Sequence, residues 1–249
     1  MYFSTFTSLR VNYEKSVIVP INTANDKMPE LANIMGCKVG SLPFTYLGLP
    51  LCLSKPKIED FMPIMQRIER RLAGCSSLLS YGDKLVLVKS VFYSLPIFFM
   101  CTLALPAGVM EQIKKYLKHF FWRKYGMEDM GTTLIAWDKV CKPKEKGGLG
   151  VLDIASHNKC LLMKHVHKFL NQQNIPWVNL IWETYYPDRM LHTNPQGSFW
   201  WKSILKLVPE FRQAAVPKIG SSNTIRFWLD NWNQGILKDR YPQLFSFSR

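Results

Sequence analysis

Apolar residues recur every three or four positions through the middle of the chain, which is the spacing of one face of an α-helix. Between Lys57 and Leu72 the apolar positions are Ile58, Phe61, Met62, Met65, Ile68 and Leu72. This pattern predicts a helix there, a second helix over 82–95 that Pro96 ends, and a third over 106–122. Three amphipathic helices in succession indicate a small helical bundle.

Short apolar runs separated by turn residues mark the first 55 residues instead. They predict a strand over 17–20, a short helix over 26–35 and a strand or hairpin over 44–53. Beyond the bundle we expect helices over 154–170, 177–186 and 198–208, and a C-terminal β-hairpin with strands 216–219 and 224–228. The expected fold class is therefore α+β and mostly α.

These patterns divide the chain into three expected segments. Residues 1–55 form a small strand and helix region, residues 56–125 a helical bundle, and residues 126–249 a helical connector with the hairpin near its end. No internal repeat or low-complexity tract interrupts this order.

Cysteine and apolar content bear on the compartment. The six cysteines are widely spaced without a CxxC pair, and the first residues lack the pattern of a secretory signal. Residues 90–110 carry no charge, but Pro96 and Pro106 interrupt them, which favours packing inside a core over crossing a membrane. We expect a nuclear or cytoplasmic protein with reduced thiols and no membrane partner.

The charge is strongly basic. The 249 residues contain 32 Lys and Arg against 18 Asp and Glu, a net charge of +14. A polyanionic partner is expected, either nucleic acid or an acidic membrane surface. Residues 57–170 hold 18 basic and 10 acidic residues, so more than half of the excess lies there.

A basic face on the three helices is the leading candidate site. Its residues are Arg67, Arg70, Arg71, Lys84, Lys89, Lys114, Lys115, Lys118, Arg123 and Lys124. Such a face binds phosphate backbones, and the aromatic residues among them, Tyr116, Phe120, Trp122 and Tyr125, are candidates for stacking on bases. The alternative is a solvated surface, which would usually mix both signs of charge.

Other candidate sites are weaker. The glycine- and lysine-rich segment 142–150 is a candidate phosphate loop but lacks the spacing of a nucleotide-binding loop, so a connector is favoured. His157, Cys160 and His167 share one side of a helix without metal-ligand spacing, so polar surface is favoured over zinc. The eight tryptophans are expected to be mostly structural. No hydrolase, metalloprotease or Walker motif occurs.

Five segments, in order, resemble the reverse transcriptase of plant LINE-type (non-LTR) retrotransposons. They are Leu9–Ser16, Leu42–Leu51, Leu79–Leu85, Pro143–Gly150 and Phe227–Trp232. Each is weak alone, but together they extend over nearly the whole chain in the order of that family. Ser8 and Cys75 depart from it, standing where the family usually has glycine and tryptophan.

The resemblance implies roles for several residues. Lys15 matches a palm lysine near the incoming nucleotide, and Tyr46, Leu47 and Gly48 match the primer-grip hairpin. Residues 1–55 would be a palm remnant with the primer-grip-like hairpin. Residues 56–125 would be the thumb, a helical bundle that holds the template–primer duplex, and residues 126–249 the connector after it. The implied nucleic-acid-binding residues are Lys15, Tyr46, Leu47, Gly48, Arg67, Arg70, Arg71, Lys84, Lys114, Lys115 and Lys118.

The resemblance also implies what lies outside this sequence. The paired aspartates that hold two magnesium ions in such polymerases do not occur here, and Met1 follows their expected place. The zinc-binding segment of the family would come after the chain. We therefore expect no catalytic residue, metal ligand or cofactor in this chain.

The expected function is that of a polymerase fragment, inactive alone, that retains binding of an RNA or DNA template–primer duplex. Two alternatives stay open: a vestigial or protein-interaction module, and a part completed in trans by the missing palm and fingers.

Overall fold

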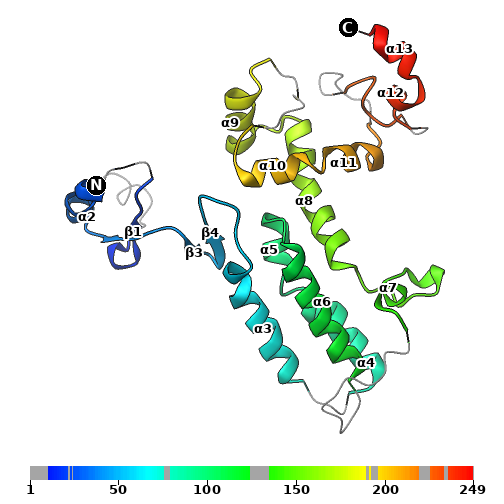
Figure 1. Cartoon of the computed structure of the whole chain (residues 1–249), viewed down its shortest axis with the longest axis horizontal. Helices are drawn as coiled ribbons and strands as arrows, with labels where there is room; N and C mark the ends of the chain where they lie inside the picture. The colour runs from blue at the N-terminus through cyan, green and yellow to red at the C-terminus, as the bar shows by residue number, and fades with distance from the viewer. Residues whose placement is uncertain are drawn as a thin grey trace. The chain divides into compact units, whose positions relative to one another are not determined.

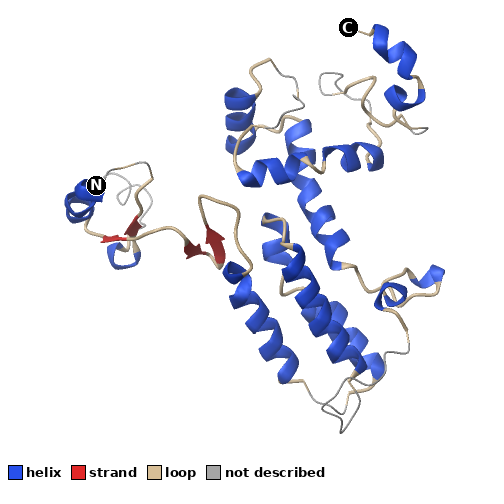
Figure 2. Cartoon of the chain, viewed as in Figure 1, coloured by secondary structure: helices blue, strands red, loops and turns tan. Residues whose placement is uncertain are grey.

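The structure, a computed structural model, describes residues 11–21, 23, 25–75, 79–123, 135–188, 191, 196–218, 225–232 and 235–248. Helices dominate these residues, and the strands are few and short (Figure 1, Figure 2). The expected α+β, mostly α class is confirmed. The chain divides into two compact units, Met1–Pro56 and Lys57–Arg249.

The first unit contains two small sheets and one α-helix. Its elements are η1 (Tyr13–Lys15), β1 (Val17–Ile18), η2 (Asn25–Lys27), α2 (Met28–Met35), β2 (Lys38–Val39), β3 (Phe44–Tyr46) and β4 (Leu49–Leu51). β1 pairs with β2 in parallel, and β3 pairs with β4 as an antiparallel hairpin. Gly36 ends α2 in a left-handed conformation, with φ 64°, that suits a residue without a Cβ. The predicted strand, helix and hairpin are all present.

The first half of the second unit is a helical bundle. Its elements are η3 (Glu59–Phe61), α3 (Met62–Ala73), α4 (Tyr81–Leu87), the π-helix η4 (Val88–Phe92), α5 (Ile97–Thr102) and α6 (Ala107–Trp122). α3 and α4 both pack against α6. The predicted second helix starts at a capping box, in which Ser80 Oγ accepts from the Asp83 N–H and Asp83 accepts from the Ser80 N–H.

The second half of the second unit contains the long helix α8. The elements are α7 (Trp137–Val140), η5 (Lys144–Lys146), α8 (Ile154–Leu170), α9 (Pro176–Tyr185), α10 (Phe199–Leu205), α11 (Val208–Ala214), α12 (Leu237–Arg240) and α13 (Pro242–Phe247). α8 has the predicted bounds. The predicted helix 198–208 is present as α10 but ends at Leu205, and a separate helix, α11, begins at Val208. α5, α6, α10 and α11 all pack on α8.

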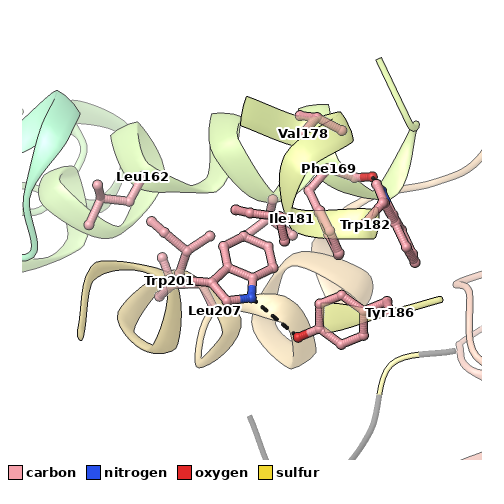
Figure 3. Packing of buried hydrophobic residues seen from close by; sticks show 10 residues of the cluster. Leu162, Phe169, Val178, Ile181, Trp182, Tyr186, Trp201 and Leu207 are labelled. Carbon is pink, nitrogen blue, oxygen red and sulfur yellow. Dashed lines mark hydrogen bonds between the residues drawn. The ribbon is translucent and has the colours of Figure 1, made fainter. Parts of the chain in front are cut away.

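An aromatic core joins α8, α9 and α10 (Figure 3). The ring of Phe169 stacks on Trp182 with centroids 4.4 Å apart and meets Trp201 edge-on at 4.5 Å. Trp201 Nε1 donates a hydrogen bond to Tyr186 Oη at 3.2 Å, so the one polar atom of this buried indole is satisfied. These tryptophans are structural, as expected.

One expectation changes in the C-terminal segment. Residues 219–224 of the predicted hairpin lie outside the described residues, and the described flanks, 216–218 and 225–230, contain no strand. Asp230 instead accepts from the Arg226 N–H at 2.8 Å and closes a turn there. The expected boundary at residue 125 also lies outside the described residues.

The uncharged stretch 90–110 is divided between the π-helix, α5 and the start of α6. Most of its large apolar side chains are buried, with Phe92, Met100 and Val109 at most 1% exposed. Within the described ranges, no helix combines the length and apolar character needed to cross a membrane.

A buried amide connects the two halves of the second unit. Asn158 of α8 is 4% exposed. Its Nδ2 donates to the carbonyls of Met100 at 2.8 Å and Leu103 at 3.0 Å, and its Oδ1 accepts from the Leu105 N–H at 3.0 Å. These three backbone groups lie at the end of α5 and in the link to α6, where no helical partner is available.

Replacing this amide should therefore destabilise the unit. Asn158→Ala leaves three buried backbone groups without partners, and we expect a loss of roughly 3 kcal/mol or more in the free energy of unfolding. Urea denaturation measures it. Asn179→Ala is the matched control, because Asn179 is exposed on α9 and its side-chain amide donates to the exposed Asn174 Oδ1. Equal midpoints for the two variants would contradict the role of Asn158.

A second prediction concerns acid sensitivity. His165 of α8 is half-buried beside Trp177 and Trp200, with Nε2 2.9 Å from the carbonyl oxygen of Cys101. Burial, aided by the nearby Lys164 and Lys168, lowers the pKa of His165 although the Cys101 carbonyl opposes this. The unfolded chain then takes up a proton more readily than the folded one, so stability is lost as pH falls through the unfolded value of about 6.5.

The melting temperature should consequently fall between about pH 7.5 and pH 5. His165→Gln keeps an N–H donor for Cys101 but does not titrate, so it should reduce this fall. Burial also lowers the pKa of His157, which accounts for a remaining part. An unchanged pH dependence in the variant would exclude His165 as a cause.

Candidate nucleic-acid interface

The hairpin of the first unit presents two large side chains at its tip. β3 and β4 pair Tyr46 with Leu49, which leaves Leu47 and Gly48 as a two-residue loop. Both loop residues have positive φ, 49° and 85°, as the tightest hairpin turns require. The side chains of Tyr46 and Leu47 are 58% and 75% exposed. The predicted hairpin is confirmed, and its contact with a primer stays a prediction.

Lys15 also belongs to the first unit and is exposed at the end of η1. Asn12 caps this turn by accepting from the Lys15 N–H at 3.1 Å. The cap fixes the backbone at Lys15 and leaves its side chain in solvent.

The outer side of α3 carries three arginines, Arg67, Arg70 and Arg71, which we call the arginine cluster. All three are exposed, and together they line a recess of about 270 Å³. The opposite side of α3 is buried through Ile64, Met65 and Ile68. Over the described part of the chain, no carboxylate lies within salt-bridge distance of the cluster.

The three lysines of α6 do not share one surface. Lys114 Nζ lies 3.3 Å from Asp138 of α7 and 3.9 Å from Glu111. Burial alone would lower the pKa of Lys114, but the hydrogen bond and charge of Asp138 outweigh it and raise that pKa. Lys118 lies on the same side, because its charge acts on the Cys141 thiol at the end of α7.

Lys115 lies on the other side of α6. There it lines a cleft between α3 and α6 together with Glu69, Ala73 and Arg123, among others. The helices that form this cleft lie side by side in Figure 1.

Lys84 was predicted to belong to the basic face, but the structure buries it. It is 6% exposed, and its Nζ donates to the carbonyl of Arg123, at the end of α6, while lying 5.5 Å from the centre of the Tyr81 ring. Burial of the amine, with the nearby Arg123 guanidinium, lowers the pKa of Lys84. The side chain is used to hold α4 against the end of α6, so it is not on an exposed face.

The single basic face expected from the sequence is therefore divided. Successive residues of an α-helix are turned by about 100°, so Arg67 and Arg71 lie about 120–160° around α3 from Glu69 and Ala73. Arg70 lies about 60° from Ala73, but none of the three arginines lines the cleft. The arginine cluster and the cleft occupy different sides of α3. Lys114 and Lys118 lie on α6, on the side that is near Asp138 of α7.

The remaining basic and aromatic candidates are in varied places. Lys89 is exposed and its Nζ donates to the Leu149 carbonyl. Phe120 and Trp122 are buried, at 7% and 8% exposed, so these two rings belong to the core. Tyr116 is half-buried in the cleft wall, while Lys124 and Tyr125 lie outside the described residues.

The loop 142–150 uses its own backbone donors. The N–H groups of residues 146–150 all bond to carbonyls between Val140 and Lys144. A Cβ on Gly148 would lie 2.0 Å from the Lys142 carbonyl oxygen, so the closed loop requires glycine there. With its donors occupied, the loop is a structured connector and offers no cradle for phosphate.

His157, Cys160 and His167 all lie on α8. No group of three or more His, Cys, Asp or Glu side chains arranged to hold a metal is found among the described residues. Cys160 and His167 are exposed on α8, as expected for polar surface.

Sequence reasoning missed the cleft between α3 and α6. Its α6 wall consists of Gln112, Lys115, Tyr116, His119 and Phe120. The signal was present as polar and aromatic residues at spacings of three and four on one flank of the helix. The prediction of a single basic face placed Lys114, Lys115 and Lys118 on one surface and did not separate Lys115.

Two proteins of Arabidopsis thaliana are similar to the chain. No protein-family model matches it. Over 196 residues, 75% of the chain, it is 30% identical to an Arabidopsis thaliana protein described as "Putative ribonuclease H protein", of which it spans 31%. Over 143 residues, 56% of the chain, it is 26% identical to an "Uncharacterized mitochondrial protein" of the same plant, of which it spans 92%. The chain thus spans about a third of the length of the first relative. Relatives of this kind are typical of retrotransposon-derived sequences.

Proposed function

We propose that the chain is the thumb and connector part of a retrotransposon reverse transcriptase, and that its helical bundle binds a template–primer duplex without polymerising alone. The observation that carries this proposal is the arginine cluster on α3. The ordered family segments and the retrotransposon-type relatives support the same assignment.

The cluster has the chemistry of a phosphate-binding surface. Arg67 and Arg71 are one turn apart, about 6 Å along the helix axis, with Arg70 between them. One strand of a duplex presents a phosphate about every 3.4 Å along its axis, so the cluster matches about two phosphates. Guanidinium groups bind phosphate oxygens through paired hydrogen bonds, and these three have no competing carboxylate among the described residues.

The proposal assigns no metal to this chain. The magnesium ions of an intact polymerase would be held by aspartates of a motif that this sequence lacks. The described residues hold no cluster of ligands that fits such ions, so we derive no catalytic step here.

A second candidate function is docking of another protein domain on the first unit. Among its described residues, the buried apolar side chains are Met28 and Ala32, whereas Ile34 and Leu53 are more than 70% exposed. A two-stranded parallel sheet is rarely stable when uncovered. The palm and fingers of a polymerase would supply the covering surface.

Neutralising the arginine cluster should weaken duplex binding. For Arg67→Gln, Arg70→Gln and Arg71→Gln together, we expect the Kd for a labelled RNA–DNA template–primer duplex to rise about tenfold or more near 0.1 M salt. The slope of log affinity against log salt should fall by about 2–3, because up to three phosphate contacts are lost. Fluorescence anisotropy over a salt series measures both quantities.

The control variant has the same loss of charge elsewhere. Lys142→Gln, Lys144→Gln and Lys146→Gln together remove three exposed charges from the connector loop. We expect a much smaller effect on affinity and slope. Equal losses in the two triple variants would mean that only net charge matters, and would reject the arginine cluster as the binding surface.

A substitution of Lys84 tests whether this residue stabilises the fold or binds the duplex. Lys84→Ala removes the donor to the Arg123 carbonyl, and we expect the free energy of unfolding to fall by about 1–3 kcal/mol. The folded variant should bind the duplex like the parent, because this amine does not reach solvent. A normal denaturation curve with a tenfold weaker affinity would return Lys84 to the binding surface.

A further inference from the structure

The cleft between α3 and α6 is a site to which the proposed duplex contact gives no role. It has a volume of about 560 Å³, which is within the range of small-molecule sites. It lies on the flank of α3 away from Arg67 and Arg71, so it is separate from the arginine cluster. Nothing in the proposed duplex contact uses it.

One part of its lining is apolar and aromatic. Leu72 of α3 faces Tyr116 and Phe120 of α6 across the cleft. Phe120 is almost buried, so the cleft reaches down to the core of the bundle. A flat ring inserted there would contact aromatic and aliphatic carbon, which is how bases are held by single-strand-binding proteins.

The other part of the lining is polar and carries excess positive charge. Lys115 and Arg123 contribute two cations, against one carboxylate from Glu69. Neither cation forms a salt bridge with a described carboxylate. Arg123 also lies near the buried Lys84 amine, whose pKa it helps to lower, so two cations lie close together at this end of α6. An anionic group bound there would relieve that repulsion.

We infer that this cleft binds one nucleotide, with its base between Leu72, Tyr116 and Phe120 and its phosphate at Lys115 and Arg123. Gln112 and Glu69 line the same cleft and supply an amide and a carboxylate for the polar edge of the base. The nucleotide comes either from the free pool or from an unpaired end of a nucleic acid. Both share this chemistry, and the cleft is open to both.

Filling the cleft is the first part of the test. Adenosine 5′-monophosphate is titrated into the whole chain by calorimetry. Ala73→Phe places a ring in the cleft from an exposed helical position, and Lys115→Gln removes one phosphate contact. We expect each change to weaken binding by about tenfold or more. No detectable binding at millimolar nucleotide, or binding that neither change weakens, would overturn the inference.

Chemical selectivity is the second part. Adenosine and inorganic phosphate should each bind more weakly than the monophosphate, because each occupies only one part of the lining. Inorganic phosphate that competes as well as the nucleotide would overturn the inference, since the apolar wall would then contribute nothing.

The two sources are distinguished with matched duplexes. One is blunt, and the other has a single-stranded overhang that carries 2-aminopurine, whose fluorescence changes on stacking. Tighter binding of the overhang duplex than of the blunt duplex, with the gain lost in Ala73→Phe, identifies an unpaired end as the source. Equal affinities of the two duplexes identify the free nucleotide.

The same series separates this inference from the proposed function. The triple arginine variant should lose the blunt duplex and keep the nucleotide, whereas Ala73→Phe should keep the blunt duplex and lose the nucleotide. Loss of both ligands in both variants would contradict separate sites on α3.

Discussion

The fold of the second unit depends on the hydrogen bonds that side chains make to the backbone groups at the end of α5. α5 ends at Thr102 and α6 begins at Ala107, so the carbonyls and N–H groups between them have no helical partners. The Asn158 amide satisfies three of these groups from α8. His165 and Trp200 meet the next two carbonyls, those of Cys101 and Thr102. Burying unpaired peptide groups is costly, so this pairing keeps α8 and α10 against the bundle.

The packing around α6 determines which of its side chains remain exposed. α6 packs between α3, α4 and α8, and its core side consists of Val109, Ile113 and Leu117, all at most 1% exposed. A helix with neighbours on several sides has little free surface left. Its lysines consequently belong to different environments, one beside a cleft and two beside the acidic end of α7.

The basic charge is therefore used in several ways. Part of it is exposed without counter-charge, in the arginine cluster. Part is neutralised, as in the pairs of Lys114 with Asp138 and Lys159 with Glu210. Part is internal, in Lys84 and in Arg212, which lies 3.9 Å from Asp230 and is mostly buried. Only the first kind is suited to bind a polyanion, so net charge overstates the size of such a surface.

Periodicity and capping residues were enough to predict the bundle helices, α8 with its bounds, the strand and hairpin of the first unit, and the arginine cluster. Each of these depends on a short segment and on one buried side, which local spacing reports directly. The split of the predicted basic face, the burial of Lys84, the closed loop before α8 and the cleft could not be obtained in that way. They depend on which other helices pack against a given helix. Packing between residues distant in the chain sets those neighbours, and a helical wheel drawn for one segment does not contain them.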